Sequence, residues 1–137
     1  MGVIARNVSA AAIALTALST ADVGAGQTPA LRRVMRQKLA HSERILASVV
    51  TSNWAQLEAD TRALQQLTAD PAWAVLMTPE YMRYTASFSS AAEALLEAAR
   101  QHDLDATPLA YVSLTLSCVQ CHRYVARARI AGGSRPD

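Results

Sequence analysis

Apolar residues recur every three to four positions through most of the chain after residue 30, and no segment alternates strictly between apolar and polar residues. This periodicity predicts α-helices and no half-buried strands. The first expected helix spans residues 31–51. We expect its inward face to carry one stripe of mostly apolar residues: Leu31, Met35, Leu39, Ser42, Leu46 and Val49.

Three further helices are expected at residues 54–67, 79–102 and 109–130. The third and fourth of the four helices each follow a threonine and a proline, at Thr78 and Thr107. Threonine caps helix N-termini well, and proline is tolerated in the first turn because its missing N–H is not needed there. Four amphipathic helices with short connections predict an all-α fold, an antiparallel four-helix bundle.

The amino terminus has the order of a secretory signal, and we assign residues 1–25 to it. Arg6 precedes the apolar stretch 8–18, and small residues follow. That stretch is shorter than the roughly 20 residues that span a bilayer, although an uncleaved anchor is the alternative. We therefore expect a periplasmic protein with no stable membrane span after cleavage, a folded domain at 26–131 and a loose tail at 132–137.

Charge excludes one class of partner. The chain has 13 Lys and Arg against 11 Asp and Glu, a net charge of +2. A nucleic-acid-binding domain normally carries a much larger basic excess gathered on one face. No nucleic-acid partner is expected.

The chain's two cysteines stand in the sequence S-C-V-Q-C-H-R-Y, where Cys118 and Cys121 precede His122. A thioredoxin-like dithiol would lie where a strand meets a helix N-terminus, because that end of the helix stabilises a thiolate. This pair instead falls in the middle of a predicted helix. A zinc site would require further ligands, and His41 and His102 are the remaining histidines.

Covalent haem attachment fits this spacing. Two thiols one helical turn apart can bond the two vinyl groups of a porphyrin, and the following residue, His122, then lies beneath the iron. The sequence therefore predicts one covalently attached haem c on Cys118 and Cys121, bound in the bundle.

A signal peptide, four helices and C-x-x-C-H inside the last helix together resemble the class II c-type cytochromes, which comprise cytochrome c′ and its methionine-ligated low-spin relatives. The resemblance covers residues 31–130. Small cytochromes c of the ordinary kind carry the motif near the amino terminus instead. The resemblance implies that Cys118 and Cys121 form the thioethers and that His122 is the proximal ligand. Many members place a tyrosine three residues after the histidine, whereas Tyr124 follows by two.

In the family, a residue of the first helix covers the sixth position of the iron. Methionine there gives a six-coordinate haem that transfers electrons, and an inert apolar residue leaves the iron open to small gases. Met35 lies in the centre of the expected stripe, so we expect it to be the distal ligand. The alternative is that Met35 only fills the core.

Other candidates for contact with the haem are weaker. His41 lies about 120° around the helix from Met35, which favours a solvated surface histidine. We expect Met77 and Met82 to pack in the core. Two arginines near the motif are candidates to bind haem propionates or to form a solvated charged face: Arg123 and Arg127.

These expectations define a periplasmic electron-transfer protein that is not an enzyme, with His122 and Met35 as ligands of the metal. A five-coordinate cytochrome c′-like protein that binds NO or CO is the alternative, and a haem-free dithiol oxidoreductase is a third reading. The redox partner is unknown. Because family members often pair as dimers, the resemblance also implies a homodimer.

Overall fold

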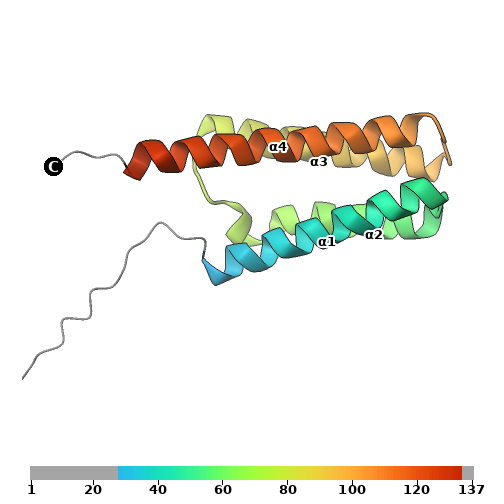
Figure 1. Ribbon diagram of the computed structural model, residues 1–137, viewed down its shortest axis with the longest axis horizontal. Coiled ribbons are helices and arrows are strands. Elements are labelled where there is room, and N and C mark those ends of the chain that lie inside the picture. The colour runs from blue at the N-terminus through green and yellow to red at the C-terminus, as the bar shows by residue number, and fades with distance from the viewer. Residues whose placement is uncertain (1–27, 134–137) are drawn as a thin grey trace, which may run out of the picture.

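The structure, a computed structural model, describes residues 28–133. Four helices, α1 (Pro29–Thr51), α2 (Trp54–Gln66), α3 (Pro79–Arg100) and α4 (Ala106–Gly133), run in alternating directions (Figure 1). The described residues form no strand, so the prediction of an all-α fold with four helices is confirmed. Between residues 28 and 133, no helix is both long and apolar enough to cross a bilayer. The expected signal peptide, residues 1–25, and residues 134–137 of the tail lie outside the described residues.

The helices form two tightly packed pairs, α1 with α2 and α3 with α4 (Figure 1). Two short 3₁₀ turns, η1 (Leu67–Ala69) and η2 (Pro71–Trp73), connect the pairs, and α2 also packs against α3. In contrast, α1 meets α4 only sparsely. One side of the bundle is therefore left partly open between the first and last helices.

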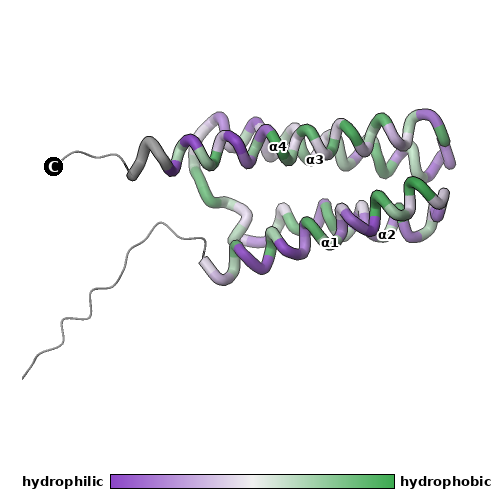
Figure 2. Tube along the Cα trace, in the orientation of Figure 1, coloured by the Kyte–Doolittle hydropathy of each residue, from purple (hydrophilic) through white to green (hydrophobic). Residues whose placement is uncertain are grey.

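The core lies where the two pairs meet, and the apolar segments of the chain line it (Figure 2). Burying a side chain such as leucine or phenylalanine contributes about 1.5–3 kcal/mol each. Helices α1, α2, α3 and α4 all contribute fully buried side chains to this core: Val34, Ile45, Leu57, Leu64, Phe88, Leu95 and Leu114.

Local capping explains most helix boundaries. The Thr78 hydroxyl accepts from the backbone N–H of Tyr81 at 3.2 Å, as the sequence predicts for the start of α3. The expected cap at Thr107 is wrong, because α4 begins earlier, at Ala106. The Asp103 carboxylate caps it instead, accepting from the backbone N–H groups of Asp105 and Ala106 at 2.9 and 2.8 Å. Aspartate in this position serves the same orphan N–H groups as threonine.

The expected inward face of α1 is partly wrong. Leu39 and Leu46 are 60% and 47% exposed, and Met35 is half-buried. Leu39 is exposed because it lies on the α4 side of α1, which the sparse α1–α4 contact leaves open, whereas the α2 side of α1 is closely packed. The residues of α1 that are buried are Leu31, Val34, Lys38, Ile45 and Ser48.

Candidate functional site

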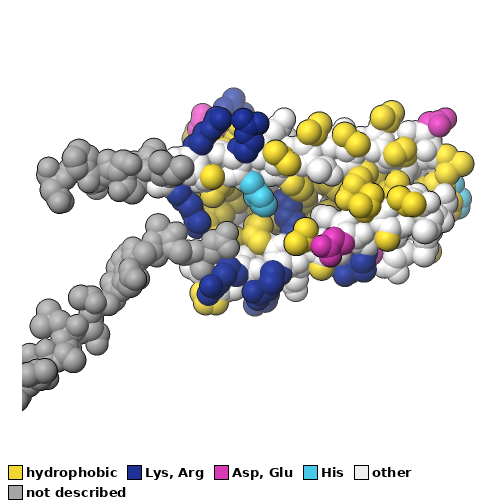
Figure 3. Space-filling view, in the orientation of Figure 1, with side chains coloured by type: hydrophobic (Ala, Val, Ile, Leu, Met, Phe, Trp, Pro, Cys, Tyr) yellow, Lys and Arg dark blue, Asp and Glu magenta, His cyan; other side chains and the backbone are white. Residues whose placement is uncertain are grey.

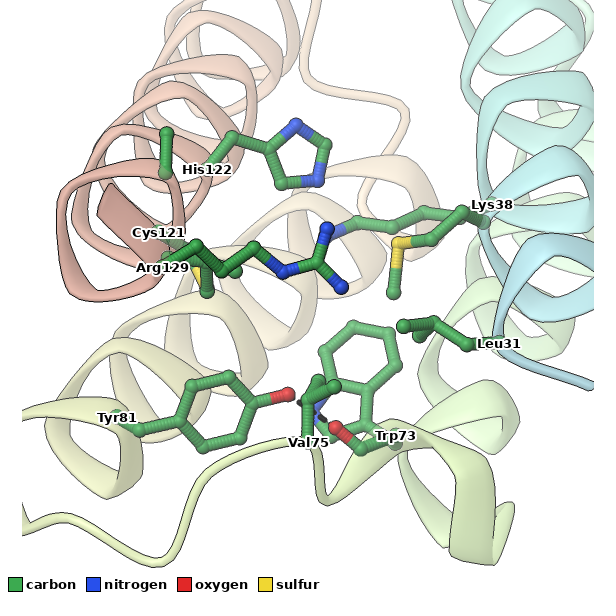
Figure 4. Close-up of a pocket in the computed structure, with 11 residues that line it drawn as sticks. Leu31, Lys38, Trp73, Val75, Tyr81, Cys121, His122 and Arg129 are labelled. Atoms are coloured by element: carbon green, nitrogen blue, oxygen red, sulfur yellow. Dashed lines mark hydrogen bonds between the residues drawn. The ribbon is translucent and has the colours of Figure 1, made fainter. Parts of the chain in front are cut away.

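The two cysteines and the motif histidine lie in the middle of α4, as the sequence predicts. Cys118 and Cys121 are both free thiols, partly buried against the core. They lie one turn apart on the same side of the helix as the buried Leu114. His122 is exposed, and its ring points from α4 toward α1 (Figure 4).

A hollow lies between α1 and α4, and it consists of two adjoining cavities of about 300 Å³ each. Cys118 lines one cavity and Cys121 lines the other. The space-filling view shows this hollow opening on the face between the two helices, among apolar and basic side chains (Figure 3). The two thiols of the motif therefore reach separate halves of a single hollow.

Three side chains line both cavities: Met35 and Lys38 from α1, and His122 from α4. They mark the place where the two halves of the hollow meet. The structure thus brings the expected proximal ligand, His122, and the expected distal ligand, Met35, to one shared centre. The prediction of which helix faces the motif agrees with this arrangement. Four residues of the expected stripe on α1 line the hollow: Leu31, Met35, Leu39 and Ser42.

Lys38 is a residue that sequence reasoning missed. It is 5% exposed, and its Nζ lies 4.7 Å from the ring centre of Trp73 and 4.4 Å from that of Phe88. Among the described residues, no carboxylate lies within ion-pair distance of this ammonium group. A signal was present in the sequence, because Lys38 is the chain's single lysine and follows Met35 by one turn.

The surroundings of His122 and Cys121 shift their protonation. Although the His122 side chain keeps contact with solvent, the protein around it partly desolvates the ring, and this effect, followed by the positive charge of Lys38, lowers the pKa of His122. The imidazole is therefore neutral at pH 7, the form that binds metals. Burial raises the pKa of Cys121, and the nearby Lys38 opposes this only in part. A thiol with a raised pKa is a poor nucleophile, which is the opposite of what a dithiol oxidoreductase requires.

The other two histidines do not join the cysteines. His41 lies in the α1–α2 contact, with its Nδ1 2.8 Å from Asp60 Oδ1, so the expectation of a solvated surface histidine is wrong. His102 stacks on Trp54 with ring centres 5.0 Å apart. Across residues 28–133, no three His, Cys, Asp or Glu side chains converge as a metal-binding group. The geometry gives no support to a zinc site built on the cysteines.

Of the remaining described methionines and arginines near the motif, only one arginine lines the hollow. Met77 and Met82 are 85% and 57% exposed, so the expectation that they pack in the core is wrong. Arg123 and Arg127 are exposed on α4 and line neither cavity. Arg129, two residues after Arg127 on α4, instead lines the cavity beside Cys121 (Figure 4).

Tyr124 faces away from the hollow, toward α3. Its hydroxyl lies 2.7 Å from Thr78 Oγ1, and its ring packs on Tyr84 with centres 5.4 Å apart. These contacts hold α4 against the start of α3. The tyrosine of the motif region therefore has a structural role here.

No family model, curated protein or solved structure matches this chain.

Proposed function

We propose that this chain is an electron-transfer protein that carries one covalently attached haem c, with His122 as proximal and Met35 as distal ligand. The observation that carries the proposal is the shared centre of the hollow. A residue able to bind iron lies on each side of it, and one motif cysteine lines each half.

The residues of the hollow fit such a group. Haem is a flat apolar macrocycle with two carboxylates, so its pocket needs apolar walls and cationic partners. The described lining is largely apolar, includes Lys38 and Arg129, and contains no acidic side chain. Two adjoining cavities of about 300 Å³ each fall within the range of small-molecule pockets.

Each residue then has a defined task. Cys118 and Cys121 hold the macrocycle from α4 through their sulfurs, while the neutral imidazole of His122 is available to the iron. Met35 offers a thioether from the opposite helix, which favours the reduced metal and excludes outside ligands. When bound, haem supplies a one-electron couple between ferric and ferrous iron. The close packing of α3 against α4 would hold Cys118, Cys121 and His122 in place when the haem changes oxidation state.

The proposal includes a periplasmic location. Residues 1–25 have the pattern of a secretory signal, and attachment of haem c to C-x-x-C-H takes place in the same compartment. A redox partner protein is required to deliver or accept the electron. No enzyme activity is part of the proposal.

Replacing the distal methionine tests the ligand assignment. We expect the haem-carrying protein to have a low-spin spectrum and to bind carbon monoxide weakly, because Met35 fills the sixth position. Met35→Ala should convert the spectrum to high-spin and open the iron to carbon monoxide. Met82→Ala is the matched control, because Met82 is exposed on α3 and should leave both properties unchanged.

Two results would contradict parts of the proposal. A low-spin spectrum that survives Met35→Ala would remove Met35 as the ligand. A wild-type protein that is high-spin and binds carbon monoxide promptly would favour the gas-binding alternative over electron transfer.

A further inference from the structure

The hollow contains a buried cation that attachment of a haem does not require. Lys38 is the chain's single lysine, whereas the other 12 basic residues among Lys and Arg are arginines. It is also the one basic residue among the buried side chains of the described chain. A buried charge normally has a paired carboxylate, because desolvation of an isolated charge is costly. The ammonium group of Lys38 has no such partner among residues 28–133.

Aromatic faces replace part of the lost hydration. Nζ of Lys38 lies over the rings of Trp73 and Phe88, which attract a cation through their electron-rich faces. Trp73 is itself fixed, because its indole N–H donates to Thr85 Oγ1 at 3.2 Å. The Tyr81 hydroxyl also donates to the carbonyl oxygen of Trp73 (Figure 4). The cation is therefore held in place at the wall of the hollow.

The position of Lys38 is central rather than peripheral. It lines both cavities, as do Met35 and His122, whereas Arg129 lines only the cavity of Cys121. Arg129 could therefore bind a carboxylate of a bound group in the cavity of Cys121, whereas Lys38 lies where the two cavities meet, next to Met35 and His122.

We propose that the positive charge of Lys38 raises the reduction potential of a haem bound in the hollow. This inference rests on the proposed function. Reduction adds one electron from the donor to ferric iron, and no proton is required. The ferric form carries one more positive charge, so a fixed cation nearby destabilises it relative to the ferrous form. Two unit charges about 10 Å apart at an effective dielectric constant of about 20 change such an equilibrium roughly tenfold.

The test is a redox titration of the haem-carrying protein against a mediator couple of known potential. Lys38→Met keeps the length and apolar stem of the side chain but removes the charge. It should shift the equilibrium about tenfold toward the oxidised form, equal to about 59 mV for a one-electron couple. Lys38→Arg should retain most of the wild-type value. Arg36→Met removes an exposed charge from the same helix and should shift the equilibrium by less than about threefold, because solvent screens that charge.

The spectra recorded in the same titration separate the outcomes. A Lys38→Met shift no larger than that of Arg36→Met overturns the proposal. A further variant, Lys38→Ala, offers the iron no replacement ligand; a change from low-spin to high-spin there also overturns the proposal, because Lys38 would then be a ligand of the iron. A wild-type protein without haem would instead contradict the proposed function itself.

A measurement on the wild-type protein does not depend on the variants folding. Because the chain has one lysine, lysine-selective ¹³Cε labelling yields one side-chain signal. We expect this signal to be strongly shifted or broadened in the ferric protein relative to the ferrous protein. An identical signal in both states would place Lys38 away from the iron and overturn the proposal.

Discussion

Lys38 on α1 and Asp60 on α2 are both buried charged residues, but their surroundings differ. Asp60 on α2 is 3% exposed and accepts from Gln56 Nε2 at 2.7 Å and from Arg44 Nε at 2.8 Å, and His41 Nδ1 also lies 2.8 Å away. Lys38 is 5% exposed but contacts aromatic faces and an open hollow. Both side chains are buried, but within the described chain only the Asp60 carboxylate has ionic and hydrogen-bonding partners.

The two sides of α1 therefore have different surroundings, one facing α2 and the other facing α4. The partners of Asp60 come from α1 and α2, so they close the contact between these helices. Where α1 faces α4, by contrast, contacts are sparse, and a cation, a thioether and an imidazole line the gap. A closed contact with satisfied polar groups stabilises the fold. The open contact with an unpaired charge is where we propose that the haem binds.

Replacing each charge in turn tests this comparison most strongly. Asp60→Ala should lower the free energy of unfolding by about 2 kcal/mol, because it removes several hydrogen bonds to a charged acceptor. The effect is limited because Arg44 is half exposed and can be hydrated after the change. Lys38→Met should change the stability by less than about 1 kcal/mol, since the lost cation–π contacts and the relieved desolvation oppose each other.

Urea unfolding of both variants, in the haem-carrying protein, provides the measurement. Equal losses of stability for Asp60→Ala and Lys38→Met would show that the two charges have similar roles. The comparison between the two sides of α1 would then fail.

A smaller effect on the free energy of unfolding is expected when the pH is lowered. Burial alone would raise the pKa of Asp60, but hydrogen bonds from Gln56, His41 and Arg44 outweigh it and hold the pKa below the ordinary value. The stabilisation is therefore fully present above the unfolded-state pKa of about 4 and is lost as pH falls through the lower folded-state pKa. The stability gap between the wild type and Asp60→Asn should narrow as the pH falls from about 5 to 3.

Urea unfolding at several pH values in this range measures that gap. A gap that stays constant would mean that the Asp60 carboxylate titrates equally in the folded and unfolded chain. Its hydrogen bonds would then make no net contribution that depends on its charge.

Local signals in the sequence predicted the fold well. Periodicity located four helices, and the Thr78–Pro79 pair gave the start of α3, because capping depends on residues only a few positions apart. The start of α4 was misplaced since both Asp103 and Thr107 are good capping residues. Only the folded chain, with Thr107 1% exposed inside the helix, distinguishes them.

The positions of the candidate site residues in the fold were predicted in part. The spacing of Cys118, Cys121 and His122 indicated a haem motif on one helix, because residues of one motif need no knowledge of distant packing. Lys38 was missed because lysines are normally exposed, and its burial depends on Trp73 and Phe88 from elsewhere in the chain. The face of α1 was likewise set by tertiary packing, which closes its α2 side and leaves its α4 side open.

Attachment of the haem is the claim on which the functional account depends. The most direct measurement is the intact mass of the chain produced together with a haem c maturation system. We expect the mass of the mature polypeptide plus one haem, retained after denaturation, and loss of this addition in the Cys118→Ala, Cys121→Ala double variant. A wild-type mass equal to that of the polypeptide alone would contradict the account.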